Sequence, residues 1–392
     1  MKKRVVIFLN RLVIGGVAQD IVSLAHYLSQ DFEILLLVGQ KNDDEQEANN
    51  LLQEYEGFSV VEMPSLKRSF SMVNDIRSYF KVKKILRSFK PHILHTHGTK
   101  PGLIGRLAAH NNKVPVILHT YHGHVFHSYF NSLVSSFIVS MDRWLAGLST
   151  KIIAISQSQK KELVERYKIC KEDKIAVIPL GVETDKFLHL EKSRQEFRDE
   201  YFLEDDELAV GIIGRIVPIK NHLFFIDAVK KILNKNSSVR VFIIGDGSAR
   251  EELEAYLDEE MIAHTFFPRN AIKSPVTFTS WQTAIRKVIA GLDIVALSSL
   301  NEGTPLSLME AQAAAKPVIA TKVGGVAEIV LDQGTGYVIE PGNLSLYTEK
   351  LKKLIENETI RLKMGADGQK FIQTNFSKQA QVSSHKLLYS YL

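Results

Sequence analysis

Cysteine is almost absent from this 392-residue sequence, and long apolar runs are missing altogether. The single thiol, Cys170, excludes an intramolecular disulfide and a metal site built from several thiolates. No stretch approaches the ~18 uncharged apolar residues of a membrane span, so no transmembrane helix is predicted. The first residues, MKKRVVIFLNRLVIGG, begin like a signal peptide, but Asn10 and Arg11 interrupt the apolar run. We therefore interpret this stretch as a buried strand.

Composition and charge indicate a globular protein with two unlike halves. Hydrophobic residues make up 45% and charged residues 24%, which excludes a disordered or collagen-like chain. Residues 1–185 hold 24 Lys and Arg against 18 Asp and Glu, whereas residues 186–392 hold 25 against 26. Nine of the 13 histidines lie in the first half. Two domains with different partners are therefore expected.

Both halves alternate short apolar runs with amphipathic stretches, which is typical of a parallel sheet covered by helices on both faces. In the first half, a helix is predicted at 17–28 and strands at 4–10, 33–39, 92–97, 115–122 and 151–156. In the second half, helices are predicted at 221–234, 249–259 and 305–315, and strands at 208–214, 239–247, 276–281, 293–299 and 317–325. The predicted fold class is α/β, with two Rossmann-like, doubly wound domains in tandem.

The polar segment 186–207 marks the predicted domain boundary. We assign residues 1–185 to the first domain, 186–375 to the second, and 376–392 to a C-terminal helix that returns toward the first domain. Ligands of such sheets bind outside the carboxyl ends of the strands. Loops of both domains are therefore expected to face a central cleft.

The most specific motif is SLNEGTPLSLMEA (299–311), at the end of a predicted strand. Thr304 is predicted to cap a helix whose first turn contains Pro305, and the free N–H groups of that turn would attract an anion. Glu302 lies in the loop, and Glu310 lies inside the helix, where its carboxylate would accept two ribose hydroxyl groups. The alternative is that both glutamates are solvated surface charges, although Glu310 has small apolar neighbours.

Two glycine turns add candidate phosphate contacts. GRIVPIKN (214–221) follows a predicted strand, and Arg215 and Lys220 would reach a phosphate as a fork and a point charge, unless they are unrelated surface bases. Gly15-Gly16 precedes a helix and allows close approach to a ligand, or simply makes a tight turn. GDG (245–247) lacks the third glycine of a dinucleotide fingerprint, and we interpret it as a turn.

Six histidines cluster in the first half, namely His95, His97, His119, His122, His124 and His127. No cysteine or carboxylate joins them at ligand spacing and no His-Glu-x-x-His motif occurs, which disfavours zinc. Most of them are expected to be buried and hydrogen-bonded. His122, at a strand end before Gly123, is the one predicted to be functional.

The sequence contains no Asp-x-Asp pair, a common means of holding a divalent ion beside a nucleotide diphosphate. The charge of a leaving diphosphate would then be neutralised by Arg215, Lys220 and helix ends. Neither a metal ion nor a cofactor is therefore expected.

These motifs resemble those of the retaining glycosyltransferases of family 4, which have the two-domain GT-B fold. The resemblance spans nearly the whole chain and is carried by HILHTHGTKPGLIGRLAA (92–109), HTYHGHVFHSYF (119–130), GIIGRIVPIKN (211–221) and DIVALSSLNEGTPLSLMEAQAAAKPVIATKVGGVAEIV (293–330). The E-x7-E pair with G-R-x4-K upstream is its most specific part. Two departures are EGTPLSLMEA, where many relatives have Phe and Gly after the first glutamate, and a longer link at 264–281.

The resemblance implies that a hexose or N-acetylhexosamine moves, with retention, from a UDP- or GDP-sugar to a glycan or lipid-linked acceptor in cell-envelope polysaccharide synthesis. It makes the first domain the acceptor side. Glu310 would bind the ribose and Glu302 would face the donor sugar. Arg215 and Lys220 would hold the diphosphate, and His122 would lie at the reaction centre. The implied donor-binding set is Gly15, Gly16, Arg215, Lys220, Glu302, Gly303, Thr304, Pro305, Leu306 and Glu310.

Other functions stay open. A nucleotide-dependent oxidoreductase should carry G-x-G-x-x-G after the first strand, which RVVIFLNRLVIGGVAQD lacks. A non-catalytic sugar-nucleotide-binding protein is disfavoured because all the motif residues occur together. An inverting or epimerase-like enzyme of the same fold would differ in the anomeric configuration of its product.

Residues 66–90 carry eight bases against one acid, with apolar residues interleaved at helical spacing. We interpret this segment as a basic amphipathic helix whose apolar stripe packs on the first domain and whose bases face anionic lipid. No nucleic-acid-binding motif accompanies it. With the resemblance, it predicts a cytoplasmic protein held peripherally on the inner face of the membrane.

Overall fold

The computed structural model describes residues 2–41, 45–67, 69, 71–123, 132–233 and 238–392. It divides into two compact units. Unit 1 comprises Met1–Gly181 together with Lys378–Leu392, and unit 2 comprises Val182–Ser377. The segment 186–207, where the boundary was predicted, therefore belongs to unit 2, and its helix packs within that unit.

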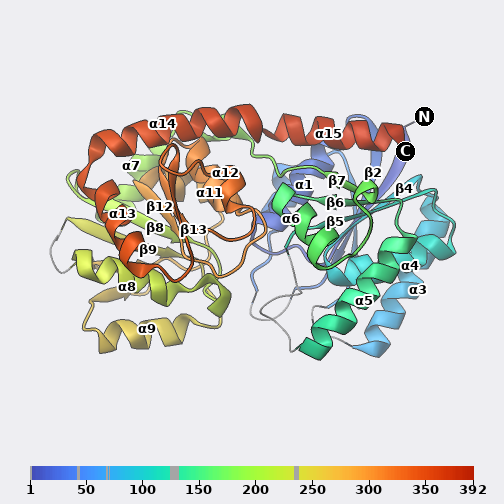
Figure 1. The fold of residues 1–392 in the computed structure, drawn as a ribbon, viewed down its shortest axis with the longest axis horizontal. Coiled ribbons are helices and arrows are strands. Elements are labelled where there is room, and N and C mark those ends of the chain that lie inside the picture. The colour runs from blue at the N-terminus through green and yellow to red at the C-terminus, as the bar shows by residue number, and fades with distance from the viewer. Residues whose placement is uncertain (1, 42–44, 68, 70, 124–131, 234–237) are drawn as a thin grey trace. The chain divides into compact units, whose positions relative to one another are not determined.

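Within the described residues, unit 1 contains a seven-stranded parallel sheet with the strand order β3-β2-β1-β4-β5-β6-β7 (Figure 1). Its strands are β1 (Lys3–Leu9), β2 (Phe32–Gly39), β3 (Ser59–Met63), β4 (Ile93–His97), β5 (Val116–Tyr121), β6 (Lys151–Ala154) and β7 (Ile175–Val177). Its helices are α1 (Gly16–Leu28), α2 (Asn50–Glu54), α3 (Met72–Phe89), α4 (Thr99–Asn111), α5 (Ser132–Leu148), α6 (Gln157–Lys161) and α15 (Lys378–Tyr391).

Unit 2 has a second seven-stranded parallel sheet in its described residues, with the order β10-β11-β9-β8-β12-β13-β14. Its strands are β8 (Leu208–Ile213), β9 (Val239–Ile244), β10 (His264–Phe266), β11 (Val276–Phe278), β12 (Ile294–Leu297), β13 (Val318–Thr321) and β14 (Gly336–Ile339). Its helices are α7 (Glu191–Glu200), α8 (His222–Leu233), α9 (Arg250–Glu259), α10 (Ile285–Gly291), α11 (Leu306–Ala313), α12 (Val326–Ile329), α13 (Leu344–Glu356) and α14 (Glu358–Asn375).

Each sheet has one point where the strand order reverses. It lies between β1 and β4 in unit 1 and between β8 and β12 in unit 2. The central strands are buried on both faces; the side chains of Val5–Phe8, for example, have no exposed surface. Ligands of doubly wound sheets bind beside such a reversal, at the carboxyl ends of the strands. The loops that follow these four strands are therefore the first places to look for a site.

The predicted α/β class with two doubly wound domains is confirmed, but several strands escaped prediction. The unpredicted strands β3, β7, β10 and β14 lie at sheet edges and contain three to five residues each. Runs of three to five residues are too short to show a clear apolar pattern. The unusually long link at 264–281 contains one of them, β10, paired with β11.

The basic segment predicted at 66–90 forms α3 over residues 72–89. Arg68 and Phe70 lie outside the described residues. Val82 and Leu86 are buried in the core of unit 1, as expected for the apolar stripe, but Ile76 and Phe80 are not. In the described chain, no helix combines the length and the apolar character needed to cross a bilayer.

Candidate functional site

Two loops meet at the strand-order reversal of unit 2. The Lys220 Nζ atom, after β8, donates a hydrogen bond of 2.5 Å to Oε1 of Glu302, after β12. The Ser299 hydroxyl donates a second bond of 2.5 Å to the same oxygen. Only 21% of the Lys220 side chain and 11% of the Glu302 side chain are exposed, so Glu302 is not the solvated charge of the alternative reading. Within the described chain, Oε2 of Glu302 receives no hydrogen bond and is available to a further donor.

Backbone contacts hold these two loops together. The Leu300 N–H donates to the Ile219 carbonyl at 2.8 Å. The buried Ser298 hydroxyl lies 2.9 Å from the carbonyls of both Lys220 and Asn221. Lys220 and Glu302 are therefore paired by the fold and not only by their charges.

The loop after β13 packs against the backbone of Glu302 and Gly303. Gly324 has a φ of +53°, and a Cβ atom there would lie 2.0 Å from the Glu302 carbonyl oxygen. The Gly325 N–H donates to the Gly303 carbonyl at 2.6 Å. Only glycine fits position 324, because its φ is left-handed and the Glu302 backbone occupies the space of a side chain.

Helix α11 places Glu310 in the interior of unit 2. The Glu310 residue is 4% exposed, so the solvated-charge alternative is wrong for this glutamate as well. The predicted cap at Thr304 is also wrong, since the N-cap is Pro305 and the helix begins at Leu306. The buried Thr304 hydroxyl has no hydrogen-bond partner among the described residues. Pro305 has an extended ψ of 109°, so the helix starts only after Pro305. Thr304 therefore lies one residue too early to be its N-cap.

Arg215 lies in the same loop as Lys220, directly after Gly214. It is half-buried. In the part of the chain that the structure describes, its guanidinium forms neither a hydrogen bond nor an ion pair. Among the described residues, this loop therefore carries one cation that is paired, Lys220, and one that has no ion-pair partner, Arg215.

In unit 1, a glycine lies in each of the loops that follow β1 and β4, the two strands at the strand-order reversal. Gly15 (φ +151°) is the N-cap of α1, which starts at Gly16, and Gly98 (φ +87°) follows β4. Among the described residues, no atom beyond the chain neighbours lies within 4 Å of a Cβ built at either position. The positive φ angles explain both glycines, and the open space beside them leaves the backbone accessible.

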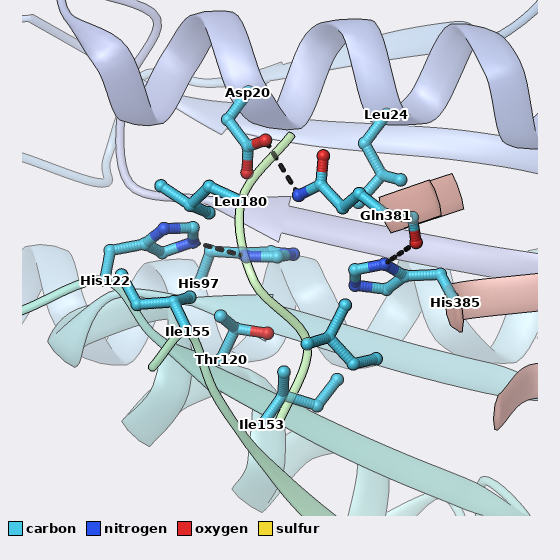
Figure 2. A pocket seen from close by; sticks show the side chains of 11 residues that line it. Asp20, Leu24, His97, Thr120, His122, Ile153, Ile155, Leu180, Gln381 and His385 are labelled. Atoms are coloured by element: carbon cyan, nitrogen blue, oxygen red, sulfur yellow. Dashed lines mark hydrogen bonds between the residues drawn. The ribbon is translucent and has the colours of Figure 1, made fainter. Parts of the chain in front are cut away.

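His122 follows β5 and lines a small pocket of unit 1, shown in Figure 2. Its Nε2 atom lies 2.8 Å from Nδ1 of His97, at the end of β4. The outer nitrogens, Nδ1 of His122 and Nε2 of His97, are buried and have no partner in the described chain. Burial lowers the pKa of His122 below its usual value, although the nearby Asp20 opposes this, and burial lowers that of His97 further. Both rings are therefore neutral at pH 7, and one proton joins them.

Sequence reasoning missed the residues that α15 brings to this pocket. Asp20 of α1 accepts hydrogen bonds from Lys378 at 2.9 Å and from Gln381 at 2.8 Å. Burial alone would raise the pKa of Asp20, but the charge of Lys378 and these hydrogen bonds hold it below its usual value. His385 donates from Nδ1 to the Gln381 carbonyl, which leaves its Nε2 as an acceptor. Since 358 residues separate Asp20 from Lys378, no local pattern signals this pairing.

Within the described residues, no three His, Cys, Asp or Glu side chains are arranged to hold a metal ion. His124 and His127 of the predicted histidine cluster lie outside those residues. His95 instead bonds to Tyr389 and Thr120, and His119 bonds to Thr96. These two histidines are structural, as predicted for most of the cluster.

The buried histidines predict a loss of stability in acid. Burial lowers the pKa of His385 in unit 1 and of His222 in unit 2 to about 4. An unfolded chain takes up these protons near pH 6.5, whereas the folded chain does not, so stability is full above that pH and falls as pH decreases toward 4. Each group accounts for at most about 3 kcal/mol. Urea unfolding at pH 7.5, 6.0 and 5.0 measures the effect, and His222→Leu should flatten it; a pH-independent midpoint would contradict this expectation.

Comparison with known proteins places these residues in a family. The family described as "Glycosyl transferases group 1" matches residues 193–371, and "Glycosyltransferase Family 4" matches residues 14–186. The chain is a group 1 glycosyltransferase. The family inferred from the motifs is thereby confirmed.

Proteins similar to this glycosyltransferase include two bacterial glycosyltransferases. It is 28% identical to the Escherichia coli UDP-Gal:alpha-D-GlcNAc-diphosphoundecaprenol alpha-1,3-galactosyltransferase, over 83% of this chain and 82% of that protein. It is also 28% identical to the Staphylococcus aureus capsular polysaccharide biosynthesis glycosyltransferase CapM, over 84% of each.

Solved structures share the fold of this glycosyltransferase. Anabaena HepE, in complex with UDP and glucose, aligns with a TM-score of 0.81 at 17% identity over 99% of both chains. The sucrose-phosphate synthase of Thermosynechococcus elongatus aligns with a TM-score of 0.80 at 16% identity, over 100% of this chain and 99% of that one. The predicted GT-B class, with its two Rossmann-like domains, is thus confirmed.

Proposed function

We propose that this glycosyltransferase moves a hexose or N-acetylhexosamine from a nucleotide-diphosphate sugar, UDP-linked before GDP-linked, to a glycan or lipid-linked acceptor in cell-envelope polysaccharide synthesis. The observation that carries the proposal is the Lys220–Glu302 pair at the strand-order reversal of unit 2, with Arg215 in the same loop as Lys220. The names of the E. coli and S. aureus relatives support this substrate class. The UDP bound to the HepE structure supports a uridine nucleotide.

In this proposal, unit 2 binds the donor. Glu310 accepts the ribose hydroxyl groups, and Arg215 and Lys220 neutralise the diphosphate. Glu302, held in place by Ser299, offers Oε2 to a hydroxyl group of the sugar. The remaining contacts come from the Glu302 loop and from the glycine turn of unit 1: Gly303, Thr304, Pro305, Leu306, Gly15 and Gly16.

The proposed reaction retains the anomeric configuration. The bond between the anomeric carbon and the diphosphate oxygen breaks, and the acceptor oxygen bonds to that carbon on the same face. The acceptor proton passes to the leaving diphosphate oxygen, so no protein nucleophile is required. His122 lies against the reacting sugar, while Arg215 and Lys220 stabilise the negative charge that develops on the leaving group.

In this scheme the cations of Arg215 and Lys220 neutralise the diphosphate, which makes a metal ion unnecessary. The expected result is full transfer activity in EDTA. The test starts with thermal shifts of the protein in UDP-, GDP-, ADP- and TDP-sugars, followed by acceptor-dependent release of the nucleotide from the best donor. No stabilisation by any donor, or donor binding without release in the presence of lipid-linked and free glycan acceptors, would contradict the proposal. A strict requirement for Mg²⁺ would contradict the role of the two cations.

Glu310→Ala is expected to weaken binding of the nucleoside diphosphate by roughly one to two orders of magnitude. The reason is that removing one partner of a buried hydrogen bond costs about 1–3 kcal/mol, at about 1.4 kcal/mol per tenfold change. Titration calorimetry measures the affinity, with Glu328→Ala, on the neighbouring helix α12, as the control. An unchanged affinity in Glu310→Ala would remove the ribose-binding role.

We further propose that the protein works in the cytoplasm, at the inner face of the cell membrane, where a lipid-linked acceptor is presented. The support is the basic helix α3 and the diphosphoundecaprenol in the name of the E. coli relative.

A further inference from the structure

Helix α3 buries its second half and exposes the apolar side chains of its first half. Val82 and Leu86 pack into the core of unit 1. Four apolar side chains near the start of the helix are 51–67% exposed, namely Met72, Val73, Ile76 and Phe80. The last three repeat at intervals of three and four residues, so they form one stripe along the helix. Core packing therefore explains only half of this amphipathic helix.

Helix α5 exposes two aromatic side chains of its own. Phe137 is 70% exposed and Trp144 is 56% exposed, and their spacing of two helical turns places them on one side of α5. Helix α4 packs against both α3 and α5, so the three helices form one layer on a face of the sheet (Figure 1). The exposed apolar residues thus belong to one helical layer of unit 1.

Charge distinguishes this layer from an ordinary solvated surface. The bases Arg77, Lys81, Lys84 and Arg87 of α3 are exposed. The acid of α3, Asp75, is paired with Lys100 at 2.6 Å, and the acid of α5, Asp142, is buried against Arg106 at 2.9 Å. Neither helix therefore presents an unpaired carboxylate. A partner with apolar chains and negative headgroups complements such a surface.

The layer also has a fixed relation to the pocket of unit 1. In a parallel α/β sheet, a helix that follows a strand begins at the carboxyl edge of the sheet. The α3 stripe and Phe137 lie in the first halves of their helices, toward the edge that carries His122. A surface bound to this layer would therefore lie on the same side as the pocket.

We propose that Val73, Ile76 and Phe80 of α3, with Phe137 and Trp144 of α5, form a membrane-docking face that inserts into an anionic lipid bilayer while the bases of α3 contact the headgroups. The inference rests on the proposed function, because a lipid-linked acceptor is the reason to bind a bilayer. It goes further by assigning the insertion to the exposed half of α3 and to a second helix.

Trp144 provides a built-in probe, since the chain contains two tryptophans and Trp281→Phe leaves this one alone. The experiment mixes that full-length variant with phosphatidylglycerol vesicles whose acyl chains are brominated, and with matched phosphatidylcholine vesicles. The expected result is a blue shift and quenching of Trp144 emission in the anionic vesicles, weakened by salt. No quenching in either type, or equal binding to both, would overturn the proposal.

Substitutions in the same background separate insertion from charge attraction. Val73→Ser with Phe80→Ser is expected to weaken vesicle binding at least tenfold, and Lys81→Gln with Lys84→Gln to remove the preference for anionic lipid. The control is Leu387→Ser on α15, where an equally exposed leucine (60%) lies outside the docking face. If the first pair leaves binding unchanged but abolishes self-association in sedimentation, the face is a contact between protein copies and the proposal is wrong.

Vesicle binding is measured without substrate, so it is independent of the proposed chemistry. Transfer to a lipid-linked acceptor in detergent, together with absent vesicle binding, would overturn the docking face and leave the function standing. Bilayer insertion together with no transfer to any acceptor would support the docking face and contradict the proposed function.

Discussion

Lys220→Ala is expected to lower turnover at least a hundredfold. The Lys220 ammonium is held by the fold 2.5 Å from Glu302, where it would meet the diphosphate of a bound donor. Removing one fixed group that stabilises developing negative charge typically costs a factor of about 10²–10³ in rate. Steady-state kinetics with the best donor measure the loss.

Lys230→Ala provides the matched control. Lys230 forms a 2.9 Å pair with Glu260 in the same unit, and its side chain is 25% exposed, against 21% for Lys220. Its removal should leave turnover unchanged. Equal activity of Lys220→Ala and Lys230→Ala would contradict a role of Lys220 at the diphosphate.

Arg215→Ala separates catalysis from stability within the same loop. Lys220→Ala leaves Glu302 without its cation and should cost about 1 kcal/mol of folding stability or more. Arg215→Ala breaks no ion pair among the described residues, so its unfolding midpoint should stay near that of the wild type while turnover falls. A large loss of stability in Arg215→Ala would mean that this side chain supports the fold.

His122→Ala is the second substitution with a large expected effect, a fall in turnover of about a hundredfold. His122 is not a fully satisfied structural histidine, because its Nδ1 is buried without a partner in the described chain. Since burial lowers its pKa, the neutral ring should persist below pH 6.5, and activity should decline only at lower pH. A pH profile of kcat/KM for the wild type measures this decline in activity.

His119→Asn is the control for His122. His119 lies on the same strand, β5, is buried and bonds to Thr96 rather than to His97. The His119→Asn variant should lose folding stability and keep most of the turnover of the wild type. Wild-type turnover in a folded His122→Ala variant would show that the His97–His122 pair is structural.

The sequence predicted the layers of the fold because short apolar runs mark most of its central strands. Buried parallel strands such as β1 and β9 are rich in β-branched and other apolar residues. The edge strands β3 and β10 could not be predicted in this way, because they are short and partly exposed. The apolar spacing of α3 signalled a helix but could not distinguish its packed half from its exposed half.

The candidate site was predictable where its residues lie close in sequence. Glu302 and Glu310 share one motif, and Arg215 and Lys220 share another, so the loops after β12 and β8 stood out. The cap at Thr304 failed because the backbone of Pro305 determines where α11 begins. The His97–His122 bond had a weak signal, since both histidines end neighbouring strands. The Asp20–Lys378 pair had none, because the fold joins opposite ends of the chain.

The stereochemistry of the product is the most direct test of the proposed retaining, metal-independent transfer. The protein, in EDTA, is given an α-linked UDP-sugar labelled with ¹³C at the anomeric carbon and a lipid-linked acceptor, and the glycoside is examined by NMR. Retention predicts an α-glycoside and one UDP released for each sugar transferred. A β-glycoside, or no transfer without a divalent ion, would contradict this proposal.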